Sequence, residues 1–287
     1  MKLKYALREA LTGYAFISIW ICGFLLFTMF PLFRTIWFSL NNVKITATGI
    51  ETTFTGFKNF QDAFLLDVAF AETLIDYLFQ LVVLVPIIIV FSIIVAILLN
   101  LKIRGKSILR TIYFLPVIIT SGPVIQKLID EGATTFPGLE QFIELSVLQQ
   151  TFPAPIARVI SFLVSSFIII LWFSGVQILI FLAGLQKLDK GMYEAADIDG
   201  ASKWESFWKL TLPAMNPLIA VNIIYTIVTY SFFALNPIIA LILESMYATG
   251  KGFGYASALA WIYFAVLLVV LGMFTYVIIR KEKRLTS

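Results

Sequence analysis

The amino-acid sequence predicts an all-α integral membrane protein with six transmembrane helices, and its composition supports this fold class in three ways. Hydrophobic residues make up 60% of the 287 residues, well above the roughly 45–50% found in soluble domains. Only 13% of the residues are charged, which is too few to cover the surface of a soluble chain of this length. The mean hydropathy is +0.94. Lipid must therefore cover much of the folded surface.

Six stretches between charged side chains are apolar enough to cross a bilayer, for which a helix needs about 20 residues. They cover about residues 10–33, 77–101, 111–126, 159–186, 218–240 and 255–279. The third is short and contains Pro116, but Arg110 and Lys127 at its ends have long side chains that can snorkel to the interfaces. The first lies near the N-terminus like a signal peptide, yet it is longer than a signal h-region and lacks a small-residue cleavage site. We therefore expect it to be retained.

The distribution of Lys and Arg predicts the orientation of these spans, because basic loops resist translocation. With six spans, both termini lie on one side, and that side carries 15 of the 21 Lys and Arg residues. We therefore expect both termini in the cytoplasm of a multi-pass protein of the cell membrane. The chain has a net charge of +4, and the distribution of its basic residues points to membrane orientation rather than to a nucleic-acid partner.

The domain organisation expected from these spans is a single transmembrane domain over residues 1–287. It has two sizeable outer loops, about 41–72 and 128–158, and one sizeable inner loop, 187–217. Within the second outer loop, Gly and Pro residues flank segment 139–148, which predicts a short helix between turns.

Several classes of site are absent from the sequence. The chain has one cysteine, Cys22, and no histidine, which excludes an intrachain disulfide and the usual zinc and haem ligand sets. Residues 105–107 match the end of a phosphate-binding loop, but Asn100 stands where its first glycine is needed. No catalytic set of histidine, cysteine or paired buried carboxylates is present. We expect no metal site, no nucleotide site and no enzyme activity in this chain.

The inner loop predicts two short helices joined by a tight turn. Gly200 suits a left-handed turn after the first helix, and Ser202 with Glu205 has the spacing of a capping box for the second, which Pro213 would end. Trp204, Phe207 and Trp208 follow at i, i+3 and i+4 and form one apolar face. From this pattern alone, an amphipathic helix lying on lipid headgroups is an equally good interpretation.

The same loop resembles the EAA loop of binding-protein-dependent ABC importer permeases. The resemblance rests on Glu194-Ala195-Ala196, Gly200 and Leu212-Pro213 at the family spacing, with Leu210 where isoleucine is usual. Other stretches are similar to the carbohydrate branch with maltose-type and glycerol-phosphate-type permeases. They are residues 30–40, 54–60, 110–116, Trp172, 183–186 and 254–258. Glu72-Thr73 departs from the Asn-Thr that is common in the family.

The resemblance implies a type I permease fold in which the EAA loop docks into an ATP-binding subunit. The residues that would couple to the ATPase are Glu194, Ala195, Ala196, Gly200, Leu210 and Pro213. It also implies a second similar permease, two ATP-binding subunits and an extracytoplasmic solute-binding protein. ATP and magnesium would bind to the partner ATPase, so no cofactor is expected in this chain.

The solute path is expected to consist of uncharged polar and aromatic side chains, because sugar hydroxyls form hydrogen bonds and sugar rings stack on aromatic faces. The candidates on the fourth and fifth spans are Trp172, Ser174, Gly175, Gln177, Asn222, Tyr225, Thr229, Tyr230 and Phe233. Similarity to maltose-type permeases places Trp172, Thr229 and Tyr230 at solute contacts. The alternative role for each of them is packing between membrane helices, where small and polar residues are common.

Two other functional classes remain as alternatives. A secondary, ion-coupled carrier usually holds charged side chains within its spans, and here only Glu72 and Asp76, near the outer end of the second span, could serve. A structural membrane subunit without transport activity is the other alternative. We expect a sugar or oligosaccharide permease within the lipid bilayer.

Overall fold

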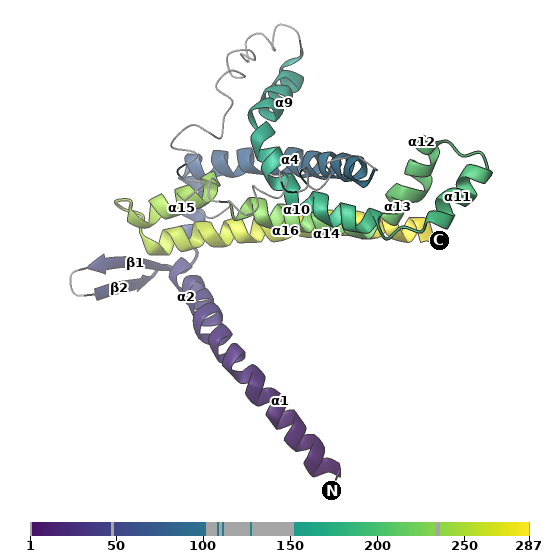
Figure 1. Ribbon diagram of the computed structural model, residues 1–287. Coiled ribbons are helices and arrows are strands. Elements are labelled where there is room, and N and C mark those ends of the chain that lie inside the picture. The colour runs from purple at the N-terminus through teal and green to yellow at the C-terminus, as the bar shows by residue number, and fades with distance from the viewer. Residues whose placement is uncertain are drawn as a thin grey trace. The chain divides into compact units, whose positions relative to one another are not determined.

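A computed structural model describes residues 2–46, 49–101, 152–233 and 236–286, together with Ile108, Thr111 and Lys127. The described chain is mainly helical (Figure 1). Its first part contains α1 (Lys2–Phe24), a π-helical turn (Leu25–Met29), α2 (Phe30–Ser39), β1 (Asn41–Thr46), β2 (Gly49–Phe54), α3 (Lys58–Leu65) and α4 (Val68–Asn100). The predicted span 111–126, residues 102–107 and most of the outer loop 128–158 lie outside the described residues.

The second part begins at residue 154 and contains most of the shorter helices. They are α9 (Ala154–Ser165), α10 (Phe167–Leu185), α11 (Lys190–Ile198), α12 (Lys203–Ser206), a π-helical turn (Phe207–Thr211), α13 (Leu212–Ala214), α14 (Asn216–Ser231) and α15 (Pro237–Tyr247). The long helix α16 (Phe253–Thr286) completes the described chain.

Three helical segments of the described residues are long and apolar enough to cross a membrane, namely Leu11–Ser39, Val68–Asn100 and Phe253–Tyr276. They overlap the first, second and sixth predicted spans. Two bent helix pairs raise the number of candidate spans to at most five in this part of the chain. The helix of the second span begins at Val68 rather than at residue 77, because Asp67 caps it by accepting a hydrogen bond from the Phe70 N–H at 3.1 Å.

The predicted fourth and fifth spans are not single helices. The fourth is divided at Ser166 into α9 and α10. In the fifth, α14 ends at Ser231 and α15 begins at Pro237, so residues 218–240 contain a break. Pro237 explains the break, because proline lacks an N–H and disfavours a helical conformation in the residue before it. The Asn236 amide donates to the Ser231 carbonyl oxygen at 2.8 Å and supplies a partner that the broken helix lacks.

The chain forms two compact units, the first from residues 1–75 and 237–266 and the second from residues 76–236 and 267–287. The first unit contains an antiparallel hairpin of β1 and β2, paired from Asn41↔Phe54 to Thr46↔Gly49. The all-α prediction missed this hairpin. Gly254 packs so closely on the chain before the hairpin that a Cβ there would collide with the Asn41 carbonyl oxygen. The Asn59 amide donates to the carbonyl oxygens of Ser39 and Asn41, at 2.9 and 3.0 Å.

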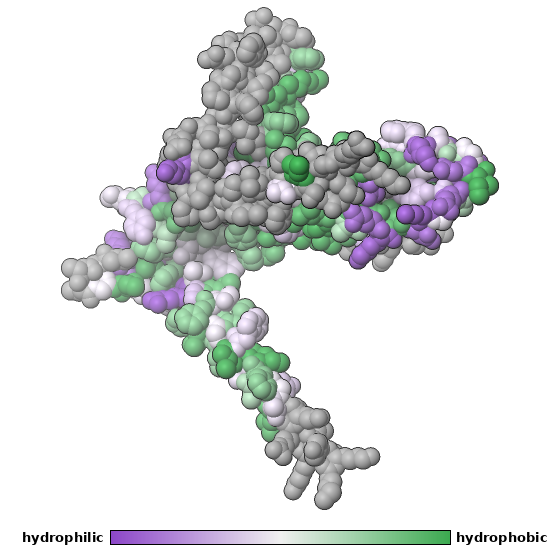
Figure 2. Space-filling view, in the orientation of Figure 1, coloured by the Kyte–Doolittle hydropathy of each residue, from purple (hydrophilic) through white to green (hydrophobic). Residues whose placement is uncertain are grey.

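The second unit has an apolar core formed by residues 76–100 of α4, by α10 and by α14. Its largest fully buried side chains include Tyr77, Leu81, Phe181 and Ile227. In Figure 2, hydrophobic residues cover most of the described surface of α1 and α2, while hydrophilic residues gather over α11 and α12. The hydrophilic surface coincides with the inner loop expected from the sequence.

Candidate functional site

The segment from α11 to α13 forms the helix–turn–helix that the inner-loop sequence predicts. Asp189 caps α11 by accepting a hydrogen bond from the Gly191 N–H at 2.9 Å. The helix ends at Ile198, and Gly200 then adopts a φ of +78°, a conformation that side chains with a Cβ rarely adopt. The left-handed turn predicted at Gly200 is confirmed.

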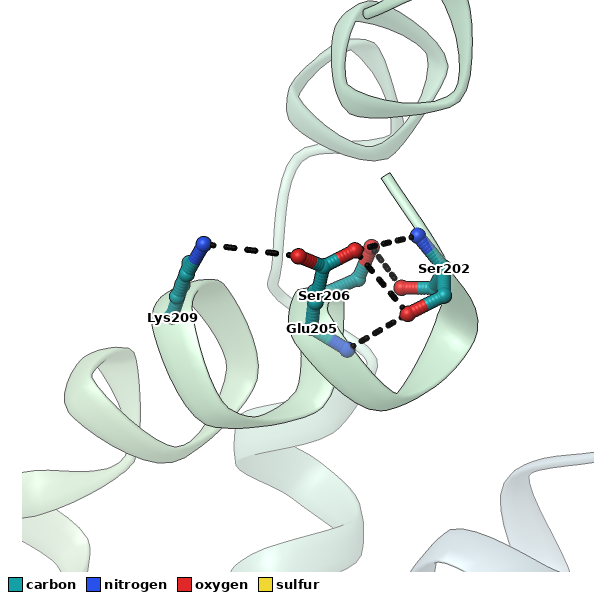
Figure 3. A network of polar contacts seen from close by, with 4 residues as sticks. All are labelled: Ser202, Glu205, Ser206 and Lys209. Carbon is teal, nitrogen blue, oxygen red and sulfur yellow. Dashed lines mark hydrogen bonds and ion pairs between the residues drawn. The ribbon is translucent and has the colours of Figure 1, made fainter. Parts of the chain in front are cut away.

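The second helix begins with the predicted capping box. The Ser202 N–H donates to Glu205 Oε2 at 2.9 Å, and the Glu205 N–H donates to Ser202 Oγ at 3.2 Å (Figure 3). Lys209 Nζ lies 3.6 Å from the other Glu205 oxygen. Lys203 forms an ion pair with Asp197 of α11 at 2.9 Å. Among these contacts, the exposed Lys203–Asp197 ion pair is the one that joins α11 to α12.

The prediction that Pro213 ends the second helix is wrong by a short margin. The helix passes through a π-helical turn at Phe207–Thr211 and ends at Ala214, and α14 then leaves at an angle of 64°. A proline removes one backbone donor and crowds the preceding turn. The wider π turn, closed by the Leu212 N–H donating to the Phe207 carbonyl, accommodates both effects.

The helix–turn–helix exposes several side chains that could contact a partner. Glu194 and Ala195 are exposed, whereas Ala196, Leu210 and Pro213 are half-buried. Ile198, which the sequence analysis did not select, is 86% exposed. Its signal in the sequence is one large apolar residue between the carboxylates of Asp197 and Asp199. Docking of a partner at this end of α11 would remove the Ile198 side chain from water.

The predicted apolar face of the second helix is also present. Trp204 and Trp208 contact each other edge to face with ring centroids 5.5 Å apart, and Phe207 contacts both rings. Trp204 is 70% exposed and Trp208 is 49% exposed. These rings could rest on lipid headgroups or on a protein partner.

The solute-path candidates gather where α10 packs on α14. The Gln177 amide nitrogen donates to Thr226 Oγ1 at 2.8 Å, and the Thr226 hydroxyl donates to the Asn222 carbonyl oxygen at 2.7 Å. All three side chains are fully buried. The sequence analysis missed Thr226, although its position four residues after Asn222 places both on one helix face.

Four buried polar atoms in this region have no hydrogen-bond partner among the described residues. They are Gln177 Oε1, both amide atoms of Asn222, and Trp172 Nε1. An unpaired buried polar group costs about 1–3 kcal/mol, so such groups in a native fold call for an explanation. These atoms would be accounted for if they form hydrogen bonds only when a solute or a water molecule is present.

Two of the aromatic candidates, Tyr230 and Phe233, pack against other aromatic rings. Tyr230 stacks on Tyr77 with ring centroids 5.8 Å apart, and Phe173 contacts the edges of Tyr230 and Phe233 at 5.4 and 5.0 Å. The Tyr230 hydroxyl donates to Gln80 Oε1 at 3.2 Å. In this conformation Tyr230 is therefore part of the packing between α4, α10 and α14.

The remaining candidates differ in exposure. Tyr225 is 37% exposed on α14, while Ser174 and Gly175 are buried on α10. The Thr229 and Ser174 hydroxyls donate to carbonyl oxygens of their own helices, at 2.7 and 2.8 Å. Within the described residues, no group of three His, Cys, Asp or Glu side chains could hold a metal ion.

Comparisons with known proteins place the chain in a family. Residues 63–284 match the model of the binding-protein-dependent transport system inner membrane component. The chain is 29% identical to the probable ABC transporter permease protein YesP of Bacillus subtilis, over 98% of this chain and 94% of that protein. It is 31% identical to the trehalose/maltose transport system permease protein MalF of Thermococcus litoralis, over 78% of this chain and 74% of that protein.

A solved structure shows the same fold. A crystal structure of a bacterial ABC transporter involved in the import of the acidic polysaccharide alginate has a chain with 19% sequence identity. The alignment covers 98% of this chain and 99% of that chain, with a TM-score of 0.63. The family model covers most of the sequence, and its match includes the helix–turn–helix and the α10–α14 region described above. This chain is therefore a member of the family of binding-protein-dependent transport system inner membrane components, the permease subunits of ABC importers.

Proposed function

We propose that the chain is one of two permease subunits of an ATP-driven importer for a sugar or oligosaccharide. Several similar proteins support the substrate class through their names, which include an arabinooligosaccharide, a multiple-sugar and a lactose transport permease. In this proposal two ATP-binding subunits hydrolyse ATP, an extracytoplasmic protein delivers the solute, and the chain has no catalytic role of its own.

The proposed topology has six spans with both termini in the cytoplasm. It rests on the 15 of 21 basic residues that fall on one side of the six-span arrangement. The helix–turn–helix of α11 to α13 then lies on the cytoplasmic side, where the ATP-binding subunit is located. The hairpin and α3 lie on the outer side.

The observation that carries the proposal is the exposed end of α11. The backbone of the exposed Ala195 can be approached closely because its side chain is a methyl group, and Glu194 can accept charge-assisted hydrogen bonds from a partner arginine. Ile198 adds an apolar side chain that would be buried on docking. Leu210 and Pro213 are half-buried in the second half of the helix–turn–helix. The segment thereby offers a small-residue contact, a charged contact and an apolar anchor on one short helix.

The solute path is proposed at the α10–α14 contact. Gln177, Asn222 and Trp172 present buried atoms that a passing hydroxyl group could satisfy. Tyr225 is exposed on the same helix as Asn222. Thr229 would join the path if its hydroxyl turned from its own helix to the solute, and Tyr230 and Phe233 would join it if their aromatic packing opened during transport.

The experiment that tests the coupling role compares two glycines of the same segment. Gly200→Ala places a Cβ at a φ of +78°, which costs about 1–2 kcal/mol, whereas Gly191→Ala meets only ordinary contacts with Asp189. In proteoliposomes containing the candidate partners, solute-stimulated ATP hydrolysis should fall in the first variant and persist in the second. Ile198→Asp and Glu194→Lys should also lower the stimulation and the recovery of the ATPase in a pull-down.

The outcomes separate the functional classes. Solute uptake that proceeds at full rate without ATP would show that the chain is an ion-coupled carrier and not part of an ATP-driven importer. If Gly200→Ala, Ile198→Asp and Glu194→Lys all keep full solute-stimulated ATP hydrolysis, the helix–turn–helix does not couple to the ATPase. It is then a connector at the membrane interface, with its tryptophans lying on lipid.

A further inference from the structure

The first unit contains a polar pocket that the transport path of the second unit does not use. The pocket has a volume of about 360 Å³, within the size range of small-molecule sites. Its walls come from the hairpin and the residue after it, from α3 and the turn between α3 and α4, and from the turn before α16 and the start of that helix. Its lining residues are Asn42, Thr55, Lys58, Asn59, Asp62, Leu66, Asp67, Gly250, Lys251 and Tyr255.

Asp67 is the fixed part of this pocket. Its side chain is only 9% exposed and forms an ion pair with Lys251 at 2.7 Å. The Tyr255 hydroxyl donates to the same carboxylate oxygen at 2.7 Å, and the Phe70 N–H donates to the other at 3.1 Å. Burial would raise the pKa of Asp67, but the hydrogen bonds from Lys251 and Tyr255 outweigh it and lower the pKa. The carboxylate is therefore charged and held in one position.

Other polar side chains of the pocket are held by the backbone or stand at its rim. Asn59 uses its amide nitrogen to bind the carbonyl oxygens of Ser39 and Asn41, which leaves its Oδ1 as an acceptor. Asn42 and Asp62 are half-buried, and Lys58 is exposed. The pocket thus offers hydrogen-bond donors and acceptors from several directions on a rigid frame.

The charges of the lining favour a neutral ligand. A cation would meet the ammonium groups of Lys58 and Lys251, and the Asp67 oxygens already accept three hydrogen bonds. An anion would meet the carboxylates of Asp62 and Asp67. A neutral molecule with several hydroxyl groups can donate to the carboxylates and accept from the ammonium and amide groups without either repulsion.

We propose that this pocket binds one unit of a neutral, polyhydroxylated solute such as a sugar on the outer face of the permease. The inference rests on the proposed function for its orientation and its substrate class. It adds a binding site in the first unit whose lining residues differ from the solute-path candidates on α10 and α14. A molecule with hydroxyl groups bound here would lie against Asp62, Asn59 and Lys58, with Asp67 behind them.

Cysteine protection tests the site in the assembled transporter. The only cysteine of the chain, Cys22, is first replaced by alanine, and Asn42→Cys then places a thiol in the pocket lining. Glu51→Cys, on the exposed strand β2 and outside the pocket lining, is the control. The transporter in proteoliposomes is labelled with a membrane-impermeant maleimide, and the extent of labelling is measured from the increase in mass of this chain. The probes are maltose, raffinose and the small polyol sorbitol.

We expect at least one of these probes to slow labelling at position 42 and to leave position 51 unchanged. At about ten times the Kd, mass action leaves roughly one site in ten open, so labelling should slow about tenfold. Adding Asp62→Asn with Lys58→Met, two side chains outside the Asp67 cluster, should abolish the protection while the complex still assembles.

Three outcomes would overturn the inference. Equal labelling at position 42 with and without the probes, or equal protection at both positions, means that no sugar occupies the pocket. Protection that requires the binding protein but no sugar would make the pocket a protein contact. ATP-driven uptake is measured in the same vesicles, so loss of protection with normal uptake removes this site and leaves the proposed function standing.

Discussion

The Asp67 carboxylate of the first unit accepts hydrogen bonds from three donors, whereas three buried atoms of the Gln177 and Asn222 amides in the second have no partner among the residues that the structure describes. The first group is charged and lies just before a helix long and apolar enough to span a membrane. The second is neutral, with Gln177 in one of the two bent helix pairs and Asn222 in the other. Both are largely shielded from solvent by their own unit.

The difference follows from the cost of leaving each group without a partner. A buried charge without a partner costs several kcal/mol, so Asp67 must be paired in the resting fold. A neutral amide without a partner costs about 1–3 kcal/mol, which a folded membrane protein can tolerate where a ligand passes. We infer that the first cluster stabilises structure and that the second is kept available for transport.

Glycine contacts provide the prediction with the largest expected effect. In Gly254→Ala the new methyl group would collide with the Asn41 carbonyl oxygen, which is backbone and cannot turn aside. In Gly184→Ala it would meet the side chain of Leu218, which can adopt another rotamer. We expect a loss of stability of about 3 kcal/mol in the first and about 1 kcal/mol in the second.

The measurement is the midpoint of thermal unfolding of the permease in lipid nanodiscs. Gly272→Ala serves as the control because, apart from the neighbouring backbone of its own helix, no described atom lies within 4 Å of its added Cβ, and alanine favours a helix more than glycine does. Equal midpoints in Gly254→Ala and Gly272→Ala would show that the close packing at Asn41 does not exist in the membrane.

The second prediction removes the centre of the charged cluster. Asp67→Ala leaves Lys251 and the Tyr255 hydroxyl without their acceptor and the start of α4 without its cap. Because Lys251 is 40% exposed, water compensates part of the loss, and we expect about 1–3 kcal/mol. Glu51→Ala, on the exposed strand, should change the unfolding midpoint little, and an equal shift in both variants would contradict the structural role of Asp67.

The elements fixed by local chemistry were predictable from the sequence. The Ser202–Glu205 capping box and the turn at Gly200 depend on residues within a few positions of each other, and the structure confirms both. The helices overlapping the first, second and sixth spans follow from uninterrupted apolar sequence. Composition and hydropathy were sufficient for these features because the bilayer imposes a simple length requirement.

The features that depend on distant residues were not predictable in the same way. Asp67 and Lys251 are 184 positions apart, so their ion pair could not be read from spacing. The partner of Gln177 is Thr226, 49 positions away. Apolarity alone also concealed the break between Ser231 and Pro237, since hydrophobic residues continue across it and only the proline marks it. The hairpin was missed because β2 (Gly49–Phe54) is exposed along its whole length, so no apolar–polar alternation marks this strand, and only β1 has buried residues, Asn41 and Val43.

The third prediction separates the two roles assigned to the clusters. Gln177→Met and Asn222→Leu remove buried polar atoms and approximately keep side-chain volume, so the unfolding midpoint should change little or rise. Uptake of the solute in proteoliposomes should fall in the same variants. Thr226→Val, which removes the hydroxyl that links Gln177 to Asn222, shows how much of the effect comes from positioning. Lower stability with normal uptake would mean that these amides serve only to pack α10 on α14.

The last prediction concerns pH and has the smallest effect, because it weakens the Asp67 cluster without removing any atoms. Hydrogen bonds from Lys251 and Tyr255 lower the pKa of Asp67 below its ordinary value of 3.8 despite its burial. A carboxylate with a lowered folded-state pKa contributes stability that is fully present above the unfolded-state pKa and is lost as pH falls through the folded-state value. Between about pH 7 and pH 5 this contribution should therefore be constant, and it should decline only below about pH 4.

Other carboxylates titrate in the same range, so the informative quantity is the difference between the wild type and Asp67→Asn. The variant keeps the shape of the side chain but loses the titrating group. The difference in unfolding midpoint in nanodiscs should be constant near neutral pH and shrink toward zero as the pH falls below about 4. If the difference in unfolding midpoint does not depend on pH, the charge of the Asp67 carboxylate adds no stability beyond that of its hydrogen bonds. The Gln177→Met variant, which changes no ionisable group, should then follow the wild type over the whole range, as expected if charge stabilises only the first of the two clusters.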